Sequence, residues 1–246
     1  MVPALSEVVQ ALEDDLKTYE TANSWSLNYF KVQNKRYEQQ IRLFQQFYKD
    51  GPILEIGALP CHFTYYLQKL GYPVTGLDIA PERAQAFIDR HGLRVKQCNM
   101  ETERLPFEDN HFHFIFFNEV FEHLRIDPIS NLKELRRILH PDGHLMLSTP
   151  NLYSVRNVKN LILGKGFDNP YRQFEKLHSL GHMGHVREYT LGQVKEFLVK
   201  TGFDVRYSRF DDFNHRLKGP ASVLHLLGNV FPGLRAILTV ICQKSN

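Results

Sequence analysis

Residues 53–67 read ILEIGALPCHFTYYL, and this stretch decides the fold class. The run 53–57 is mostly apolar and ends in glycine, which predicts a buried strand entering a turn at Gly57. Residues 61–70 predict a helix, because Gly71 ends their helical pattern. A dinucleotide-binding turn has further glycines, whereas leucine, proline and cysteine stand there in this chain. The stretch predicts strand, turn and helix, and leaves the chemistry of the turn open.

Short apolar runs alternate with helical patterns after this first strand. Six more runs predict strands, at residues 73–79, 93–98, 112–120, 144–150, 203–210 and 236–244. Helices are predicted at residues 81–90, 129–139 and 190–201, and a turn at residues 140–143. Alternating strands and helices favour right-handed crossovers and a parallel sheet. The sequence therefore predicts an α/β fold with a mostly parallel seven-stranded sheet.

The segments outside this alternation suggest the domain organisation. Residues 4–20 and 28–49 predict helices, so we expect an N-terminal helical cap over residues 1–50 and one domain over residues 51–246. Residues 151–188 are rich in asparagine, glycine and histidine, and we expect an irregular, substrate-facing insertion there, since long connections are often functional.

The composition narrows the function classes. Hydrophobic residues make up 43% of the 246 residues, enough for a sizeable core, and a net charge of +3 is too small to favour a nucleic-acid partner. No apolar run reaches the roughly 20 residues that a transmembrane helix needs, and no secretory signal is visible. Three widely spaced cysteines form no CxxC pair, which favours the reducing cytoplasm.

Two residues suggest a cofactor site. Gly57 follows the first predicted strand and Asp78 ends the second, so that the spacing is 78 − 57 = 21. An acidic residue about 20 positions after a glycine turn can accept hydrogen bonds from ribose hydroxyls. Any α/β sheet can also place an aspartate at a strand end, so these two residues alone leave both interpretations open.

The segments that follow carry a family resemblance. Residues 99–124 read NMETERLPFEDNHFHFIFFNEVFEHL, and residues 134–151 read ELRRILHPDGHLMLSTPN. Together with VTGLDI at 74–79, they resemble class I S-adenosylmethionine-dependent methyltransferases of the type 11 kind, in order over about residues 50–151. The resemblance implies a Rossmann-like, doubly wound sheet with helices on both faces and an N-terminal helical lid, which would include Tyr29 and Tyr37. It implies S-adenosyl-L-methionine as the cofactor.

By position, the resemblance implies cofactor contacts at the strand ends. The residues concerned are Glu55 and Gly57 near the methionine part, Asp78 on the ribose, Asn99, Met100 and Glu101 around the adenine, and Asn118 and Glu119 facing the sulfonium and the substrate. The family usually has aspartate at the position of Asn99 and glycine at alternate positions after the first strand. S-adenosylmethionine has no phosphate, so fewer backbone N–H groups are needed than for a dinucleotide, and Pro60 suits a helix start.

Methyl transfer to a hydroxyl requires a base with a pKa near neutrality, and histidine suits that role. Residues 174–190 hold three histidines next to other polar side chains. The candidates are His182 or His185 as the base, with Arg187, Tyr189 and Tyr29 binding the substrate. The alternative, favoured on general grounds, is that these histidines form hydrogen bonds within an irregular loop.

Two further interpretations concern the remaining histidines. A metal site at His178, His182 and His185 is disfavoured because Gly181 and Gly184 interrupt the helix it would need, so we expect no metal. His123 is either a substrate contact or base, or a helix-start histidine bonded to local backbone, and we favour the second. For Cys61, which has no base in its motif, we expect small apolar filling rather than catalysis.

Two classes of function remain. The first is an enzyme that methylates a small molecule or a sugar, on oxygen; GALPCHFT, STPN and GHVREYT are similar to bacterial methyltransferases of glycan assembly. Transfer of another group from the same cofactor is a variant of it. The second is a non-catalytic binding module on the same fold. Residues 217–241 are apolar. They could contact a membrane surface or a lipid-linked acceptor. We favour the alternative that they form the last helix and strand of the core.

Overall fold

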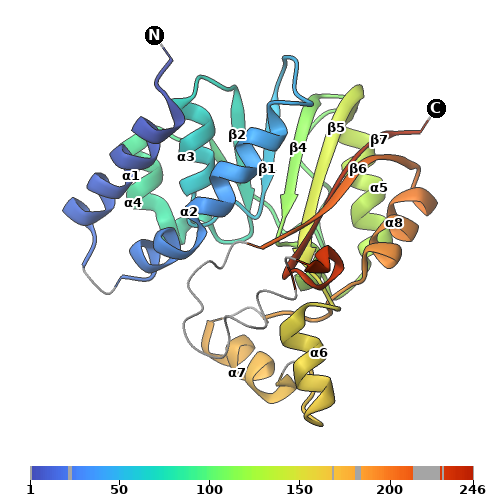
Figure 1. Ribbon diagram of the computed structural model, residues 1–246. Coiled ribbons are helices and arrows are strands. Elements are labelled where there is room, and N and C mark those ends of the chain that lie inside the picture. Colours follow the sequence, from blue (N-terminus) through green and yellow to red (C-terminus); the bar gives the residue numbers. More distant parts are fainter. Residues whose placement is uncertain are drawn as a thin grey trace. The chain divides into compact units, whose positions relative to one another are not determined.

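The computed structural model describes residues 2–21, 24–167, 169–180, 184–212, 228 and 230–245 (Figure 1). Within them, seven strands form one sheet in the order β3-β2-β1-β4-β5-β7-β6. The strands are β1 (Ile53–Ile56), β2 (Val74–Asp78), β3 (Val95–Gln97), β4 (Phe112–Asn118), β5 (Leu139–Pro150), β6 (Phe203–Asp211) and β7 (Ile237–Lys244). β1, β2 and β3 pair in parallel, whereas β7 runs antiparallel to β5 and β6. The mostly parallel, Rossmann-like seven-stranded sheet is confirmed.

Eight α-helices and three short 3-10 turns accompany the sheet in the described part of the chain. The helices are α1 (Leu5–Tyr19), α2 (Trp25–Phe44), α3 (His62–Lys69), α4 (Gln85–His91), α5 (Pro128–Ile138), α6 (Val155–Ile162), α7 (Pro170–Leu180) and α8 (Leu191–Lys200). The 3-10 turns are η1 (Pro81–Ala84), η2 (Phe121–His123) and η3 (Pro232–Leu234). No helix among the described residues is both long and apolar enough to cross a membrane.

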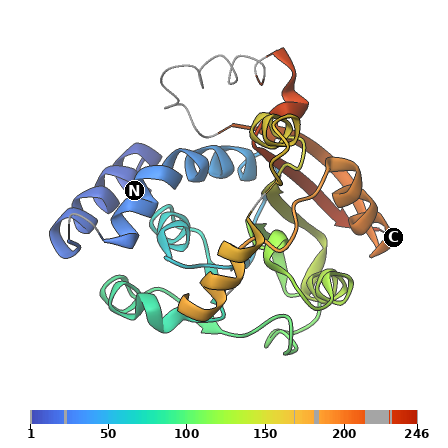
Figure 2. The same ribbon diagram turned by 90° about the horizontal axis from the view of Figure 1, so that it is seen from below.

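The chain packs as two compact units, which we describe separately. Unit 1 consists of Met1–Phe116 with Arg137–His144, and unit 2 of Phe117–Arg136 with Leu145–Asn246. In unit 1, α1 contacts α2 and α3, and α3 lies against β2 (Figure 2). The parallel strands β1, β2 and β3 therefore present their carboxyl ends at one edge of the unit 1 sheet.

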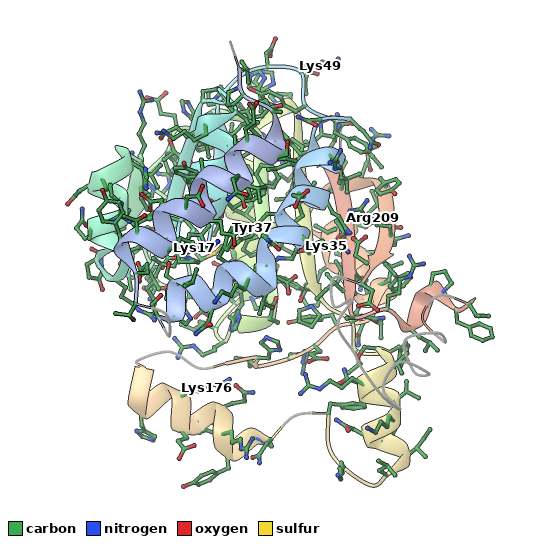
Figure 3. All side chains as sticks on the ribbon, turned by 60° about the vertical axis from the view of Figure 1, so that its left-hand side comes forward. Lys17, Lys35, Tyr37, Lys49, Lys176 and Arg209 are labelled. Atoms are coloured by element: carbon green, nitrogen blue, oxygen red, sulfur yellow. The ribbon has the colours of Figure 1, made fainter. Side chains whose placement is uncertain are left out.

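Aromatic rings fill the core of unit 1. The fully buried ring of Phe44, at the end of α2, lies 4.8 Å from that of Phe114 and 5.2 Å from that of Phe116. Tyr37, labelled on α2 in Figure 3, packs 5.2 Å from Phe63 and 5.9 Å from Tyr66. Each such ring contributes about 1.5–3 kcal/mol through removal from water. The second helix thus packs on β4 through Phe44 and on α3 through Tyr37.

The core of unit 2 holds a second ring cluster. The ring of Phe121 lies 4.6 Å from Tyr189 and 5.4 Å from Phe197, and the last two lie 5.9 Å apart. Asn151 donates from Nδ2 to the carbonyl oxygens of Gly233 and Arg235, both at 2.8 Å. These contacts join three segments of unit 2 that are distant in sequence.

Several predicted boundaries are corrected by local chemistry. α2 begins at Trp25 rather than at residue 28, because Ser24 caps it by accepting a hydrogen bond from the N–H of Leu27. It ends at Phe44 rather than at residue 49. The predicted turn at 140–143 is part of β5: a Cβ on Gly143 would lie 2.9 Å from the carbonyl oxygen of Phe112, so glycine lets the chain continue beside β4.

The insertion at residues 151–188 is not irregular as expected. It contains α6, capped by the hydroxyl of Ser154, and α7, which begins at Pro170. The predicted helix start at His123 is likewise wrong, since η2 is a single turn and α5 begins at Pro128. Of the apolar stretch 217–241, β7 is present as predicted, while the expected helix lies almost entirely outside the described residues.

Candidate active site

The turn after β1 takes a conformation that its single glycine makes accessible. Gly57 has a φ of 73°, in the left-handed region that favours glycine. The N–H groups of Gly57 and Ala58 both donate to the carbonyl oxygen of Leu77 on β2, at 2.9 and 3.1 Å. Cys61 also has a positive φ, of 69°, and precedes α3. The Leu59–Pro60 peptide bond is cis. Because α3 begins at His62 after Cys61, Pro60 belongs to the turn rather than to the first turn of the helix.

Asp78, at the end of β2, holds this turn in place. Its Oδ2 accepts a hydrogen bond from the N–H of Leu59 at 3.0 Å, and its Oδ1 accepts one from the N–H of Ala80 at 3.0 Å. Leu59 stands at a position where the family has glycine, and its N–H donates to the carboxylate that is predicted to bind the ribose. Each carboxylate oxygen has a second lone pair for a ligand hydroxyl.

The turn lies close to β2, and Gly76 permits this approach. A Cβ on Gly76 would lie 3.0 Å from the Cβ of Ala58, 3.2 Å from the Oγ1 of Thr64 and 3.3 Å from the Cγ2 of Val95. Cys61 is completely buried, and burial raises the pKa of its thiol. It acts as small apolar filling beneath the turn, which is what its lack of a paired base indicates.

The turn after β3 closes on itself through Asn99. The side-chain Oδ1 of Asn99 accepts a hydrogen bond from the N–H of Glu101 at 3.1 Å, and its carbonyl oxygen accepts from the N–H groups of Thr102 and Glu103. An amide oxygen accepts as a carboxylate oxygen does, so asparagine preserves this turn where the family has aspartate. Asn99, Met100 and Glu101 are half-buried.

Glu55 is a buried carboxyl group on β1. Thr64 donates a hydrogen bond from Oγ1 to Glu55 Oε2. Burial raises the pKa of Glu55 to about 8, and the carboxylate of Asp78 adds to the rise, whereas Thr64 and the guanidinium of Arg36 oppose it. A cationic ligand beside Glu55 would favour its ionised form.

A buried histidine next to the turn was not singled out from the sequence. His62 opens α3 and shares a hydrogen bond of 2.9 Å between its Nε2 and the Oγ of Ser26 on α2. Burial lowers the pKa of His62 to about 3, so its imidazole is neutral. The position of His62 directly after the turn is the sequence feature that could have identified it. It fixes the start of α3 against the N-terminal helices.

The two tyrosines expected in a lid differ in their surroundings. Tyr29 is half-buried, and its ring lies 5.6 Å from the ring of Trp25, which is largely exposed. Tyr37 is buried in the core of unit 1, and burial raises the pKa of its hydroxyl. Only Tyr29 is therefore accessible to a ligand.

β4 ends at Asn118 and Glu119 follows it, both in unit 2. The side-chain oxygen and nitrogen of Asn118 are buried and form no hydrogen bond within the described residues. Glu119 has a φ of 56°, unusual for a residue with a side chain, and its Oε1 accepts from the Oγ of Ser148 at 2.9 Å. Strained backbone and unsatisfied buried amides are typical of ligand-binding positions.

One buried carboxylate and two histidines follow in unit 2. Glu122 is buried, and its Oε2 accepts a hydrogen bond from the Oγ1 of Thr149 at 2.9 Å. Its Oε1 lies 3.9 Å from the Nε2 of His123 and 4.0 Å from the Nε2 of His185. We call these three residues, Glu122, His123 and His185, the Glu-His-His cluster.

His123 has a partner that is distant in sequence. Its Nδ1 lies 3.0 Å from the carbonyl oxygen of Gly184, 61 residues away. The N–H groups of Val186 and Arg187 donate to the carbonyl oxygen of Glu122. The segment that carries His185 is thereby fixed to η2, which brings the two histidines together.

The other predicted substrate residues are dispersed. Arg187 is exposed, whereas Tyr189 is 3% exposed and packs in the ring cluster of unit 2. Burial raises the pKa of the Tyr189 hydroxyl, against a lowering by Arg187. His182 lies outside the described residues, and His178 is exposed on α7.

These residues fit the cofactor that the sequence resemblance implies. In unit 1, the ends of β1, β2 and β3 bring together a buried acid, a glycine turn, a carboxylate and an asparagine turn. In unit 2, the buried amide of Asn118 requires hydrogen-bond partners that a ligand can supply. S-adenosylmethionine supplies an activated methyl group on a sulfonium, and the protein supplies binding and orientation.

Comparisons with known proteins agree. A family model described as a methyltransferase domain matches residues 31–208. An S-adenosylmethionine-dependent methyltransferase from Archaeoglobus fulgidus superposes with a TM-score of 0.62 at 16% identity, over 90% of this chain and 100% of that one. The Burkholderia thailandensis 1,6-didemethyltoxoflavin-N1-methyltransferase, with bound 1,6-didemethyltoxoflavin and S-adenosylhomocysteine, gives 0.60 at 15% identity, over 100% and 92%. No curated protein matches the sequence. The chain thus belongs to the methyltransferase domain family and is an S-adenosylmethionine-dependent methyltransferase.

Proposed function

We propose that this enzyme methylates a hydroxyl oxygen of a small-molecule or sugar acceptor. An oxygen–methyl bond forms as the sulfur–methyl bond breaks, and the electron pair of the broken bond stays on sulfur. The products are a methyl ether and S-adenosylhomocysteine, and the hydroxyl proton passes to a base. The eight strand-end residues, from Glu55 to Glu119, are the cofactor contacts in this proposal, with residues 1–50 as the cap of the domain at 51–246.

The Glu-His-His cluster carries the proposal. A hydroxyl requires removal of its proton during methyl transfer, whereas a neutral amine can attack the methyl group directly. The cluster follows the carboxyl end of β4, and ligands of open α/β sheets bind beyond such ends. The side chains of His123 and His185 are 39% and 37% exposed, so an acceptor can reach them. His185 or His123 is the base, and Arg187 and Tyr29 are the accessible acceptor contacts.

Three sequence segments support the acceptor class. The segments GALPCHFT, STPN and GHVREYT are similar to those of glycan-associated methyltransferases, which favours a sugar. The Burkholderia relative is named for methylation on nitrogen, so nitrogen is the competing acceptor atom.

An acceptor screen tests the reaction. The full chain is incubated with S-adenosylmethionine and matched pairs of acceptors that differ only in a hydroxyl or an amine, sugars included. We expect release of S-adenosylhomocysteine and a product heavier by one CH₂, with an O-methyl signal by NMR. Transfer to the amine alone contradicts the oxygen assignment, and another mass increase indicates another transferred group. No cofactor binding by calorimetry at millimolar concentration would point to a non-catalytic module.

Substitution of the histidines tests their role. His185→Ala and His123→Ala should each lower kcat by about 100-fold or more, because general base catalysis typically contributes that much. Their affinity for S-adenosylhomocysteine should not change. His182→Ala is the variant that addresses the third candidate, and His178→Ala, on the exposed face of α7, is the control. Full activity in both the His185 and the His123 variant refutes this role.

A further inference from the structure

We propose that the Glu-His-His cluster binds one divalent transition-metal ion. This proposal deepens the proposed function, because the ion would acidify the acceptor hydroxyl. Only this catalytic role of the ion rests on the proposed function; the binding of the ion does not. One carboxylate oxygen and two imidazole nitrogens all lie within 4.8 Å of one another. Metal binding by this cluster is measurable without any acceptor.

The three ligand atoms converge on one point. The Nε2 atoms of His123 and His185 approach the same oxygen, Oε1 of Glu122, at 3.9 and 4.0 Å. These distances are too long for hydrogen bonds. Bonds of about 2.0–2.2 Å to a shared ion place two ligand atoms roughly 3–3.5 Å apart. Each imidazole nitrogen therefore needs to approach the Oε1 of Glu122 by about half an ångström or slightly more.

The outward-facing nitrogens of the two histidines each face an oxygen atom. A carbonyl oxygen can only accept, so His123 donates from Nδ1 to Gly184, and the neutral imidazole then has its lone pair on Nε2. The Nδ1 of His185 lies 3.6 Å from the Oε1 of Glu188, which also accepts a hydrogen bond from Asn157 through Oε2. Histidines that ligate metals usually have such a carbonyl or carboxylate partner on the other nitrogen.

The carboxylate is oriented in the same manner. Glu122 is 1% exposed, and the Oγ1 of Thr149 binds its Oε2, which directs Oε1 at the two imidazoles. A buried carboxylate is costly unless a positive charge accompanies it, and a cation between the three ligand atoms supplies that charge. The competing explanation is a protonated imidazole, which binds no metal.

The ligand set indicates the class of ion. Two imidazoles and one carboxylate suit Zn²⁺, Mn²⁺, Fe²⁺ or Co²⁺, whereas Mg²⁺ and Ca²⁺ prefer oxygen ligands. Three protein ligands leave positions for other molecules, as in catalytic rather than structural sites. An acceptor hydroxyl bound there loses its proton to solvent more readily, because the ion stabilises the alkoxide. The two histidines then act as ligands rather than as direct bases.

Metal titration of the full chain tests the proposal. The chelator-treated protein is titrated with Co²⁺, followed by visible absorption, and with Zn²⁺, followed by calorimetry. We expect one ion per chain and cobalt bands in the visible range. Glu122→Gln, His123→Ala and His185→Ala should each weaken binding at least about tenfold, and Glu188→Gln about tenfold through His185.

Two controls separate this site from surface binding and from misfolding. His111→Ala and His178→Ala remove exposed histidines outside the cluster and should leave the titration unchanged. Thermal unfolding and binding of S-adenosylhomocysteine check the fold of each variant; if Glu122→Gln does not fold, His185→Ala decides, because its side chain is partly exposed.

The outcomes for metal and for methyl transfer are distinguishable. Equal metal binding by wild type and cluster variants, or no binding at all, overturns the metal site; hydroxyl methylation that then persists leaves the histidines as direct bases. Metal binding that depends on the cluster, without methylation of any hydroxyl, supports the site and contradicts the proposed function.

Discussion

Two buried glutamates, one in each unit, accept a hydrogen bond from a threonine hydroxyl through Oε2. Glu55 on β1 has Thr64 as its partner, and Glu122 in η2 has Thr149. They differ in what faces the other oxygen. Glu122 has two imidazoles within 4.0 Å, whereas the surroundings of Glu55 favour a neutral carboxyl group at neutral pH. The same residue pair thus lies in surroundings that favour a neutral carboxyl group in one unit, and directs a carboxyl oxygen at two imidazoles in the other.

This difference follows from the neighbouring elements. Glu55 lies within a four-residue strand in which every residue is buried, so desolvation dominates its ionisation. Glu122 lies in a 3-10 turn beside a segment that contributes imidazoles. Both carboxyl groups are buried, so the difference between them comes from the imidazoles that only Glu122 faces.

The largest expected effect is the pH dependence of stability that Glu55 introduces. Its pKa is about 8 in the folded chain and 4.5 when unperturbed. Between these values the folded state holds a proton that the unfolded state lacks, so the free energy of unfolding falls as pH rises. The slope approaches about 1.4 kcal/mol per pH unit. Glu55→Gln resembles the protonated form and should remove this slope, which urea unfolding at pH 5 and pH 8 measures.

The matched control is Glu108→Gln, at an exposed position of unit 1. It should leave the slope of the wild-type protein in place. If wild type and Glu55→Gln lose stability in parallel between pH 5 and pH 8, Glu55 is ionised in the folded chain, and the contrast with Glu122 disappears.

A smaller effect is expected when the two hydrogen bonds that Asp78 accepts at the end of β2 are weakened. Asp78→Asn keeps one acceptor oxygen for the two N–H groups of Leu59 and Ala80, and replaces the other with a donor. We expect affinity for S-adenosylhomocysteine to fall about tenfold to hundredfold, and stability without ligand to fall by about 1–2 kcal/mol. Calorimetry and urea unfolding measure the two effects.

Asp89→Asn, on the exposed face of α4, serves as the control for the change of charge. Unchanged affinity for S-adenosylhomocysteine in the Asp78 variant would remove this residue from the cofactor site. A loss of affinity with no loss of stability would instead show that the hydrogen bonds from Leu59 and Ala80 to Asp78 do not stabilise the fold.

The smallest effect is expected at the threonine of unit 2. Thr149→Val removes the hydroxyl that orients Glu122 while keeping the shape of the side chain. Stability should fall by about 1–2 kcal/mol, because a buried acceptor loses its donor. Affinity for S-adenosylhomocysteine should stay the same, unlike in the Asp78 variant, and Thr102→Val at an exposed position is the control. A loss of cofactor affinity contradicts the separation of the two regions.

Local patterns predicted most of unit 1 correctly. β1, β2 and the start of α3 lie within a residue or two of their predicted bounds, because burial and helix stops act over a few residues. The position of Asp78 at a strand end also follows from the pattern. The hydrogen bond from the turn to Asp78 does not follow from the pattern, because its donor is Leu59, at a position where glycine was expected.

The sequence pattern did not predict the contacts between segments that are distant in sequence. The spacing argument against a metal considered only histidines within residues 178–185, while the structure pairs His185 with Glu122 and His123. Likewise, α6 and α7 are short helices in a segment whose asparagine, glycine and histidine content suggested an irregular connection.

The sequence by itself determined the alternation of strands and helices, the strand ends that carry the candidate cofactor residues, and the family resemblance that the family match bears out. The tertiary structure alone decided that Glu55 is held neutral, that the side-chain amide atoms of Asn118 are buried without a hydrogen bond in the described chain, and that Glu122 lies beside two imidazoles. The reason is physical. Strand and helix patterns depend on neighbours a few positions away, whereas desolvation and ligand geometry depend on whatever the fold brings within a few ångströms.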